Sequence, residues 1–186
     1  GTVALRAENV NVHDVSVPTP PDLAAVVGDT DLYSVRASLV HDTRDSAFLA
    51  TQGHRIEMYY EQGFGEFDFP RGGVEASQFY LLRERADESG RHVLALRSEL
   101  GVSGNQTPVF ERFYAGGFST IRGFDFRGAS PRVFGVEVGG NFMMLGSVEY
   151  LFPLTADDML RGVVFVDSGT VADSVKLDAA DFRVAP

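Results

Sequence analysis

Apolar and polar residues alternate one by one along several segments of about ten residues, and this pattern constrains the fold more than any other feature. In "HRIEMYYEQ", Ile56, Met58 and Tyr60 fall on one face, whereas Arg55 and Glu57 fall on the other. A period of two residues is that of a β-strand with one apolar and one polar face. Helical periodicity is almost absent, so the chain is expected to be all-β.

The expected strands cover most of the chain. They run over residues 2–13, 32–42, 53–62, 73–83, 91–101, 140–153 and 161–172. The final "DFRVAP" has the pattern of a further strand that is just beginning, which makes about seven to eight strands. Residues 22–27, "DLAAVV", are expected to form one helical turn.

Two architectures fit the alternation. In a soluble β-sandwich the apolar faces meet in a core, and in an antiparallel transmembrane β-barrel they face lipid while the polar faces line the lumen. Alternation alone favours the sandwich, because soluble all-β domains are common. The strand length, the charged second faces and one long connection over 102–139 favour the barrel. Aromatic residues near the strand ends resemble interfacial girdles, namely Tyr33, Tyr60, Tyr150 and Phe152.

Charge and composition exclude several classes of protein. The chain has 26 acidic residues against 16 Lys and Arg, a net charge of -10, which argues against nucleic-acid binding. It contains no cysteine, so it has neither a disulfide framework nor a thiolate metal site. No apolar run approaches the ~18 residues that a membrane-spanning helix needs.

The sequence contains no motif of a catalytic site. His41, Asp42 and Asp45 in "HDTRD" are interpreted as turn-forming residues rather than metal ligands. There is no HExxH and no GxSxG pattern, and the glycine-rich "GFGEFDFPRGG" lacks the Lys-Ser/Thr pair of a phosphate loop. We therefore expect neither enzyme activity nor a metal or cofactor.

Four motifs occur in one order along the chain. The first is "HDTRDSAFLATQG", and the long connection then carries "FERFYAGGFSTIRGF", with Gly116, Gly117 and the tetrad 121–124. "GSVEYLFPL" and "VVFVDSGTV" follow. Over nearly the whole chain these motifs resemble the BamA-like outer-membrane assembly factor superfamily, the bacterial surface antigen barrels. Ala50 is a departure, since relatives often have a proline there.

The resemblance implies a role for the arginine of the tetrad Ile121, Arg122, Gly123 and Phe124. In the family, this loop folds back into the barrel lumen, and the arginine reaches carboxylates on the next two strands. Carried over, Arg122 would meet Glu149 and Asp167, and the alternation agrees, because both lie opposite apolar rows. A guanidinium can grip a carboxylate in a two-pronged fork.

Neighbouring residues are expected to support this contact. Phe165 and Gly169 flank Asp167 on the inner face, and Gly123 permits a sharp turn beside the arginine. Phe124 and Phe126 are expected to wedge the loop tip in place. Lumen water is expected to screen the ion pair.

The resemblance also implies an identity for the whole segment. Residues 1–186 would be part of a single outer-membrane β-barrel domain, with the remaining strands and the periplasmic repeat domains elsewhere in the full protein. The expected location is the bacterial outer membrane, and the expected partners are its lipid, unfolded outer-membrane protein clients and accessory assembly lipoproteins.

Three functions remain open at this stage. The first is an insertase that folds β-barrel proteins, templating client strands by edge pairing at a weak barrel seam. The second is a polypeptide-secretion pore of the same superfamily. The third is a soluble β-sandwich that acts as a binding module.

Overall fold

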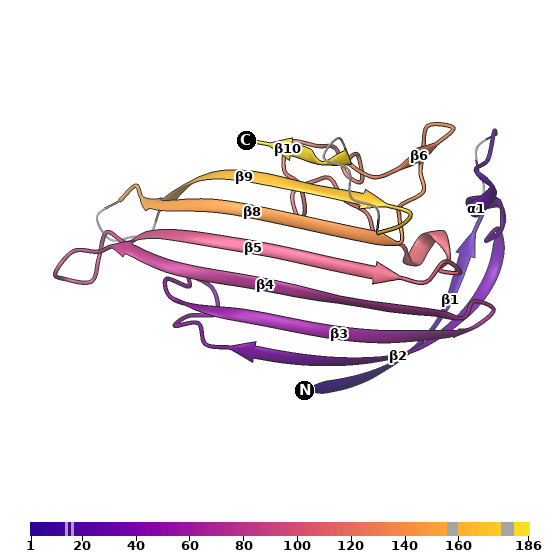
Figure 1. The fold of residues 1–186 in the computed structure, drawn as a ribbon, viewed down its shortest axis with the longest axis horizontal. Coiled ribbons are helices and arrows are strands. Elements are labelled where there is room, and N and C mark those ends of the chain that lie inside the picture. The colour runs from indigo at the N-terminus through magenta and orange to yellow at the C-terminus, as the bar shows by residue number, and fades with distance from the viewer. Residues whose placement is uncertain (14, 16, 156–159, 176–180) are drawn as a thin grey trace.

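The computed structural model describes residues 1–13, 15, 17–155, 160–175 and 181–186. Its main feature is one eight-stranded antiparallel sheet in the order β1-β2-β3-β4-β5-β8-β9-β10, which Figure 1 shows as a continuous wall. Each long strand pairs with the strands next to it in the chain, so the topology is a meander. Among the described residues β1 and β10 do not pair with each other, so the sheet is open.

The long strands match the segments that alternate in the sequence. They are β1 Thr2–Val12, β2 Gly28–Asp42, β3 Gly53–Gly65, β4 Phe69–Arg83, β5 His92–Ser103, β8 Phe142–Pro153 and β9 Arg161–Ala172. The short β10, Arg183–Ala185, pairs with Asp167–Gly169 of β9, as the "DFRVAP" pattern predicts. Several strands extend a few residues beyond their expected ends, where glycine interrupts the alternation but ladder hydrogen bonds continue.

The two faces of the sheet differ as the alternation predicts. We call the face that carries Arg97, Glu149 and Asp167 the inner face, and the opposite one the outer face. Apolar side chains on the outer face stay exposed, including Met58, Leu96, Met144, Val148 and Val166. Phe142 lies on the same side of β8 as Met144 and Val148 but is only 3% exposed. A soluble sandwich would bury such a row against a second sheet, so the barrel prediction fits and the sandwich prediction does not.

The long connection after β5 contains secondary structure of its own. It contains a short 3-10 helix, η1 Val109–Glu111, and a two-stranded ladder of β6 Arg132–Val133 and β7 Val136–Glu137. A bridge between Phe113 and Gly140 closes its base. We call residues 104–141 the long loop. Figure 1 shows it folded beside β8, β9 and β10 rather than extended away from the sheet.

The expected helical turn is present as α1, Pro21–Ala24, between β1 and β2. Proline near its start suits the first turn of a helix, where backbone N–H groups have no partner. No helix among the described residues has the length and apolar character needed to cross a membrane.

Buried apolar clusters lie where connections pack on the inner face. The largest joins the long loop to β8 and β9 through Ile121, Met143, Leu145 and Val171, among others. A second forms at the opposite strand ends, where Ala50 of the β2–β3 turn packs with Phe79, Val93 and Ala95. Ala50 is therefore a buried residue of this turn.

Arginine on the outer face should block membrane assembly. Val148 is 49% exposed, and its cross-strand neighbours are Leu96 and Val166. Val148→Arg should cost about 2–4 kcal/mol if that face meets lipid, because a cation near the bilayer midplane loses its hydration. The folded yield of the full-length protein, measured by gel mobility without boiling, reports the effect.

Glu75→Arg is a matched control on the inner face. Its cross-strand neighbours are Glu57 and Glu99, so a new cation there meets two carboxylates. This variant should assemble at close to the wild-type yield. Equal loss of yield in both variants would contradict the assignment of the faces.

Candidate functional site: the arginine anchor of the long loop

Arg122 binds Asp167 through three hydrogen bonds. Its Nε donates to Oδ2 over 2.7 Å, its Nη2 donates to Oδ1 over 2.7 Å, and its backbone N–H donates to Oδ2 over 3.0 Å. The two guanidinium bonds form the planar fork that arginine makes and lysine cannot. The structure thus brings together Arg122 and Asp167, as the sequence predicts.

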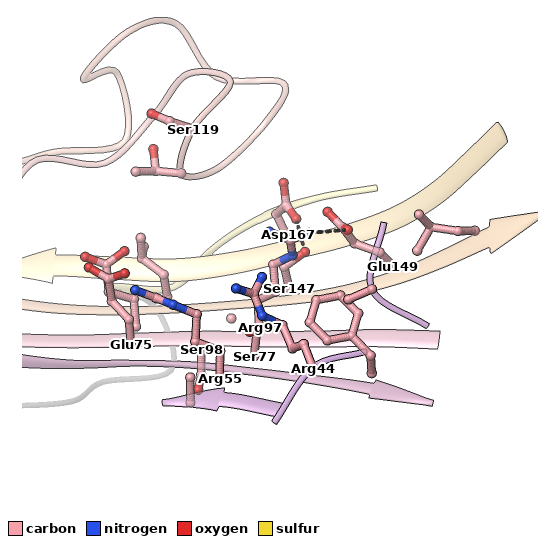
Figure 2. Close-up of a pocket in the computed structure, with 18 of the residues that line it drawn as sticks. Arg44, Arg55, Glu75, Ser77, Arg97, Ser98, Ser119, Ser147, Glu149 and Asp167 are labelled. Atoms are coloured by element: carbon pink, nitrogen blue, oxygen red, sulfur yellow. Dashed lines mark hydrogen bonds and ion pairs between the residues drawn. The ribbon is translucent and has the colours of Figure 1, made fainter. Parts of the chain in front are cut away.

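Glu149 is the second carboxylate at Arg122, again as predicted. Its Oε1 lies 2.8 Å from Arg122 Nη2, and its Oε2 lies 3.4 Å from Nη2 of Arg97 on β5. One carboxylate therefore links the long loop, β8 and β5. Figure 2 shows Asp167, Ser147 and Glu149 close together on neighbouring strands, with Arg97 beside them.

Two residues of this network, Ser147 and Arg97, were not predicted as partners from the sequence. Ser147 lies directly opposite Asp167 in the β8–β9 register, and its hydroxyl donates to Asp167 Oδ1 over 2.7 Å. The same hydroxyl accepts from Arg122 Nη2 over 3.0 Å. Arg97, the other missed residue, was already visible as a polar inner-face residue. The alternation shows which residues lie on the inner face, but it does not show which of them contact one another.

The ring of Phe165 supports the guanidinium from β9. Arg122 Cζ lies 3.6 Å from the ring centroid, which is a close cation–π contact. The hydrogen bonds to Asp167 raise the pKa of Arg122 above its ordinary value, while burial opposes this shift and Glu149 reinforces it. Arg122 is therefore a cation at every pH that a cell reaches.

The expectation of water screening is wrong for Asp167. This residue is only 1% exposed, because the long loop, Ser147 and its own strand cover it. Its charge is consequently balanced by Arg122 and by hydrogen bonds rather than by solvent. A buried carboxylate that loses its partner is much more costly than an exposed one.

Ile121 holds the loop beside the arginine. Its side chain is buried among Phe113, Leu145 and Val171, and Phe124 packs against the same cluster. A β-carbon on Gly169 would lie 2.5 Å from Leu145 Cδ2 and 3.2 Å from Ile121 Cδ1. Gly169 thus leaves the space into which the loop docks.

The glycines of the motif shape the loop. Gly116 has a φ of 112°, and a β-carbon there would lie 2.5 Å from the carbonyl oxygen of Asp125. Gly123, with a φ of 87°, makes the sharp turn after Arg122 that the sequence predicts. Gly117 also has positive φ. Phe126 does not wedge the tip as expected, since it is 77% exposed.

Asp42 and Asp45 are turn-forming residues, as interpreted from the sequence. Asp45 accepts hydrogen bonds from the backbone N–H groups of Thr51 and Gln52, and Asp42 accepts from Arg44 Nε over 2.9 Å. His41 lies against His54, with ring centroids 5.1 Å apart. Within the described parts of the chain, no three His, Asp or Glu side chains are arranged to hold a metal ion.

An open cavity of about 800 Å³ lies beside the arginine anchor on the inner face. The loop residues Phe118 and Ser119 line it from one side, and Phe48 of the β2–β3 turn lines it from another. Its wall carries both signs of charge, from Arg55, Glu75, Arg97, Glu99 and Glu149. Figure 2 shows Ser119 on the loop above several of these wall residues.

These features define a class of protein. A meander sheet with an exposed apolar outer face, a polar inner face and a long loop bound to the inner face is part of a membrane β-barrel wall with an internal loop. A model of the Omp85 superfamily domain matches residues 2–185. The chain belongs to the Omp85 superfamily.

Individual relatives agree with this family. The outer membrane protein assembly factor BamA of Nitratidesulfovibrio vulgaris is 29% identical over 179 residues, which cover 91% of this chain and 22% of that protein. BamA of Neisseria meningitidis serogroup B is 33% identical over 98 residues, or 46% of this chain and 12% of that protein. The chain therefore spans less than a quarter of these curated relatives.

A solved structure confirms the fold prediction. The crystal structure of BamA from Haemophilus ducreyi lacking POTRA domains 1–3 superposes with a TM-score of 0.67 at 19% identity. The match covers 77% of this chain and 30% of that one. The predicted BamA-like antiparallel barrel fold is thus confirmed, with the sheet open in this chain.

Removing the arginine should release the loop. Arg122→Ala leaves Asp167 buried without its cation, so we expect a loss of on the order of 3 kcal/mol in the free energy of loop docking. Arg122→Lys should lose most of it too, because an ammonium cannot form the fork. Limited proteolysis of the full-length protein in membranes should show faster cleavage within 104–141.

Glu149→Gln tests which of the two carboxylates contributes more to holding the loop. Arg122 keeps its fork with Asp167 in this variant, so cleavage should rise less than in Asp167→Asn. Wild-type cleavage rates in both Arg122 variants would show that the arginine does not anchor the loop.

Adding a methyl group at Gly169 should disturb docking from the wall side. Gly169→Ala places a methyl group 2.5 Å from Leu145 Cδ2 and 2.8 Å from the Met144 carbonyl oxygen, so β8 and the loop packed on it have to shift, at a cost of about 1–3 kcal/mol for overpacking. Gly146→Ala is the matched control, since a β-carbon there meets nothing closer than 3.9 Å. Loop cleavage should rise in the first variant alone, and an equal response in both would contradict the packing argument.

Proposed function

We propose that this chain is part of the barrel domain of an outer-membrane assembly factor, which folds and inserts β-barrel proteins. The anchored loop carries the proposal, because the contacts of Arg122 with Asp167 and Glu149 occur on an Omp85 superfamily domain. The names of the bacterial relatives add support, since both are outer membrane protein assembly factors.

The described wall would serve as the fixed part of the barrel. Strands β2 to β5 and β8 each pair with a neighbour on both sides, so none of them offers a free edge to a client strand, whereas β9 pairs with β10 only at Asp167–Gly169. Pairing with a client needs an open edge. A client strand would therefore pair at a seam outside these five strands, while the anchored loop keeps their inner face in one shape.

The proposal also covers the rest of the protein and its partners. Residues 1–186 would form part of one barrel domain, with further strands and periplasmic repeat domains completing it. The partners would be outer-membrane lipid, unfolded outer-membrane protein clients and accessory assembly lipoproteins. The relatives are named as assembly factors, so we propose a role without a catalytic reaction.

Reconstitution of the full-length protein in lipid vesicles tests the function. A denatured β-barrel client should fold into the vesicles faster with the wild-type protein than without it, as measured by gel mobility without boiling. Arg122→Ala should lower this rate several-fold while the protein itself remains folded, because a loose loop no longer holds the inner face in place.

A secretion pore would give a different result. The client would then be protected inside the vesicle lumen, without becoming embedded in the bilayer as a folded barrel. That outcome, or client folding at the same rate with and without the protein, would overturn the proposal.

A further inference from the structure

Glu111 lies in the long loop ahead of the arginine motif and contacts the sheet elsewhere. It is the last residue of η1 and is only 5% exposed. Its Oε1 lies 2.9 Å from Arg6 Nη1, and its Oε2 lies 3.3 Å from Arg71 Nη1. The two cations balance the charge of the buried carboxylate. Removing the charge of one partner alone is costly, because it leaves the other charge buried without compensation.

The two arginines belong to strands that are not neighbours. Arg6 lies on β1 and Arg71 on β4, and β2 and β3 separate them in the sheet. Both side chains belong to the inner face: Arg6 is opposite Ser34, and Arg71 shares its row with Glu75 and Phe79. Glu111 therefore joins two distant strands through the space that the sheet encloses.

Other contacts hold the same part of the loop. The guanidinium of Arg71 lies 4.7 Å from the ring centroid of Phe113, and that ring packs over Gly101 of β5. Val109 is buried with Val26 and Val138. Thr107, Val109 and Phe113 are each at most 5% exposed, so this end of the loop is as buried as the Ile121 end.

Arg71 depends on the loop for its ion pair. Its Nε makes no hydrogen bond within the described residues, and the ion pair that its guanidinium forms there is with Glu111. Arg6 has a further partner, Glu8, at 2.6 Å. If Glu111 loses its charge, Arg71 is left without an ion-pair partner among the described residues, whereas Arg6 still has Glu8.

We propose that Glu111 is a second ionic anchor of the long loop, opposite in charge to Arg122 and independent of it. Arg122 places a loop cation against carboxylates of β8 and β9, whereas Glu111 places a loop carboxylate against arginines of β1 and β4. The loop thus crosses the inner face and connects β1 and β4 with β8 and β9. Glu111 is a positioning residue, and its role holds whichever polypeptide the whole protein handles.

Cysteine reporters distinguish the two anchors, because the chain has no cysteine of its own. Val109→Cys reports the Glu111 end and Ala115→Cys reports the Arg122 end, since both native residues are buried. The measurement is the rate at which a water-soluble maleimide labels each reporter in the folded full-length protein in membranes. Folded protein is recognised by its gel mobility without boiling.

Glu111→Gln should raise the labelling rate of the Val109→Cys reporter by about tenfold and leave the Ala115→Cys reporter slow, because only one end of the loop opens. Arg122→Ala should do the reverse. Arg71→Gln should raise the labelling rate of Val109→Cys as Glu111→Gln does. The double variant should label no faster than either single variant, as expected for two groups that act through one contact.

Glu137→Gln is the matched control. Glu137 also pairs with an arginine in the long loop, but its partner is Arg132 of the β6–β7 ladder, so this pair does not reach the wall. It should leave both reporters slow. Wild-type labelling of Val109→Cys in Glu111→Gln, or strictly additive effects of Glu111→Gln and Arg71→Gln, would overturn the proposal. Neither outcome would bear on client insertion, which is measured separately.

Discussion

The carboxylate of Asp167 sits on the inner wall with almost no contact with solvent, and its charge has to be balanced within the protein. Arg122 supplies that balance from the long loop. The fork, the backbone N–H and the Ser147 hydroxyl satisfy both carboxylate oxygens at once. The carboxylate of Asp167 therefore gains its hydrogen bonds from Arg122 only when the loop is docked.

This dependence follows from the way the sheet uses its faces. Since the apolar residues of the outer face are left for a lipid environment, they cannot form an internal core. The interior has to be packed by connections that fold back, and the long loop and the β2–β3 turn do this from opposite ends. Ionic contacts then provide specificity, because a polar inner face offers few apolar sites to define one loop position.

Much of the arginine anchor was predictable from the sequence. The alternation placed Glu149 and Asp167 on the same face of adjacent strands, and the family resemblance linked both to Arg122. Ser147 and Arg97 were visible as inner-face residues, but their contacts depend on strand register and side-chain reach. The expected wedge by Phe126 failed, because this side chain is largely exposed. The β6–β7 ladder was missed because strands of two residues are too short for a periodic pattern.

The sequence by itself determined the strands, their apolar and polar faces and the residues available to anchor a loop. It could do so because a period of two is a local property, set by the geometry of each strand. Only the tertiary structure decided that the Arg122 guanidinium forms its fork with Asp167, that Asp167 is buried, and that Glu111 reaches Arg6 on the first strand. Those contacts join residues far apart in the chain, and they depend on the path of the loop across the sheet, which no local pattern specifies.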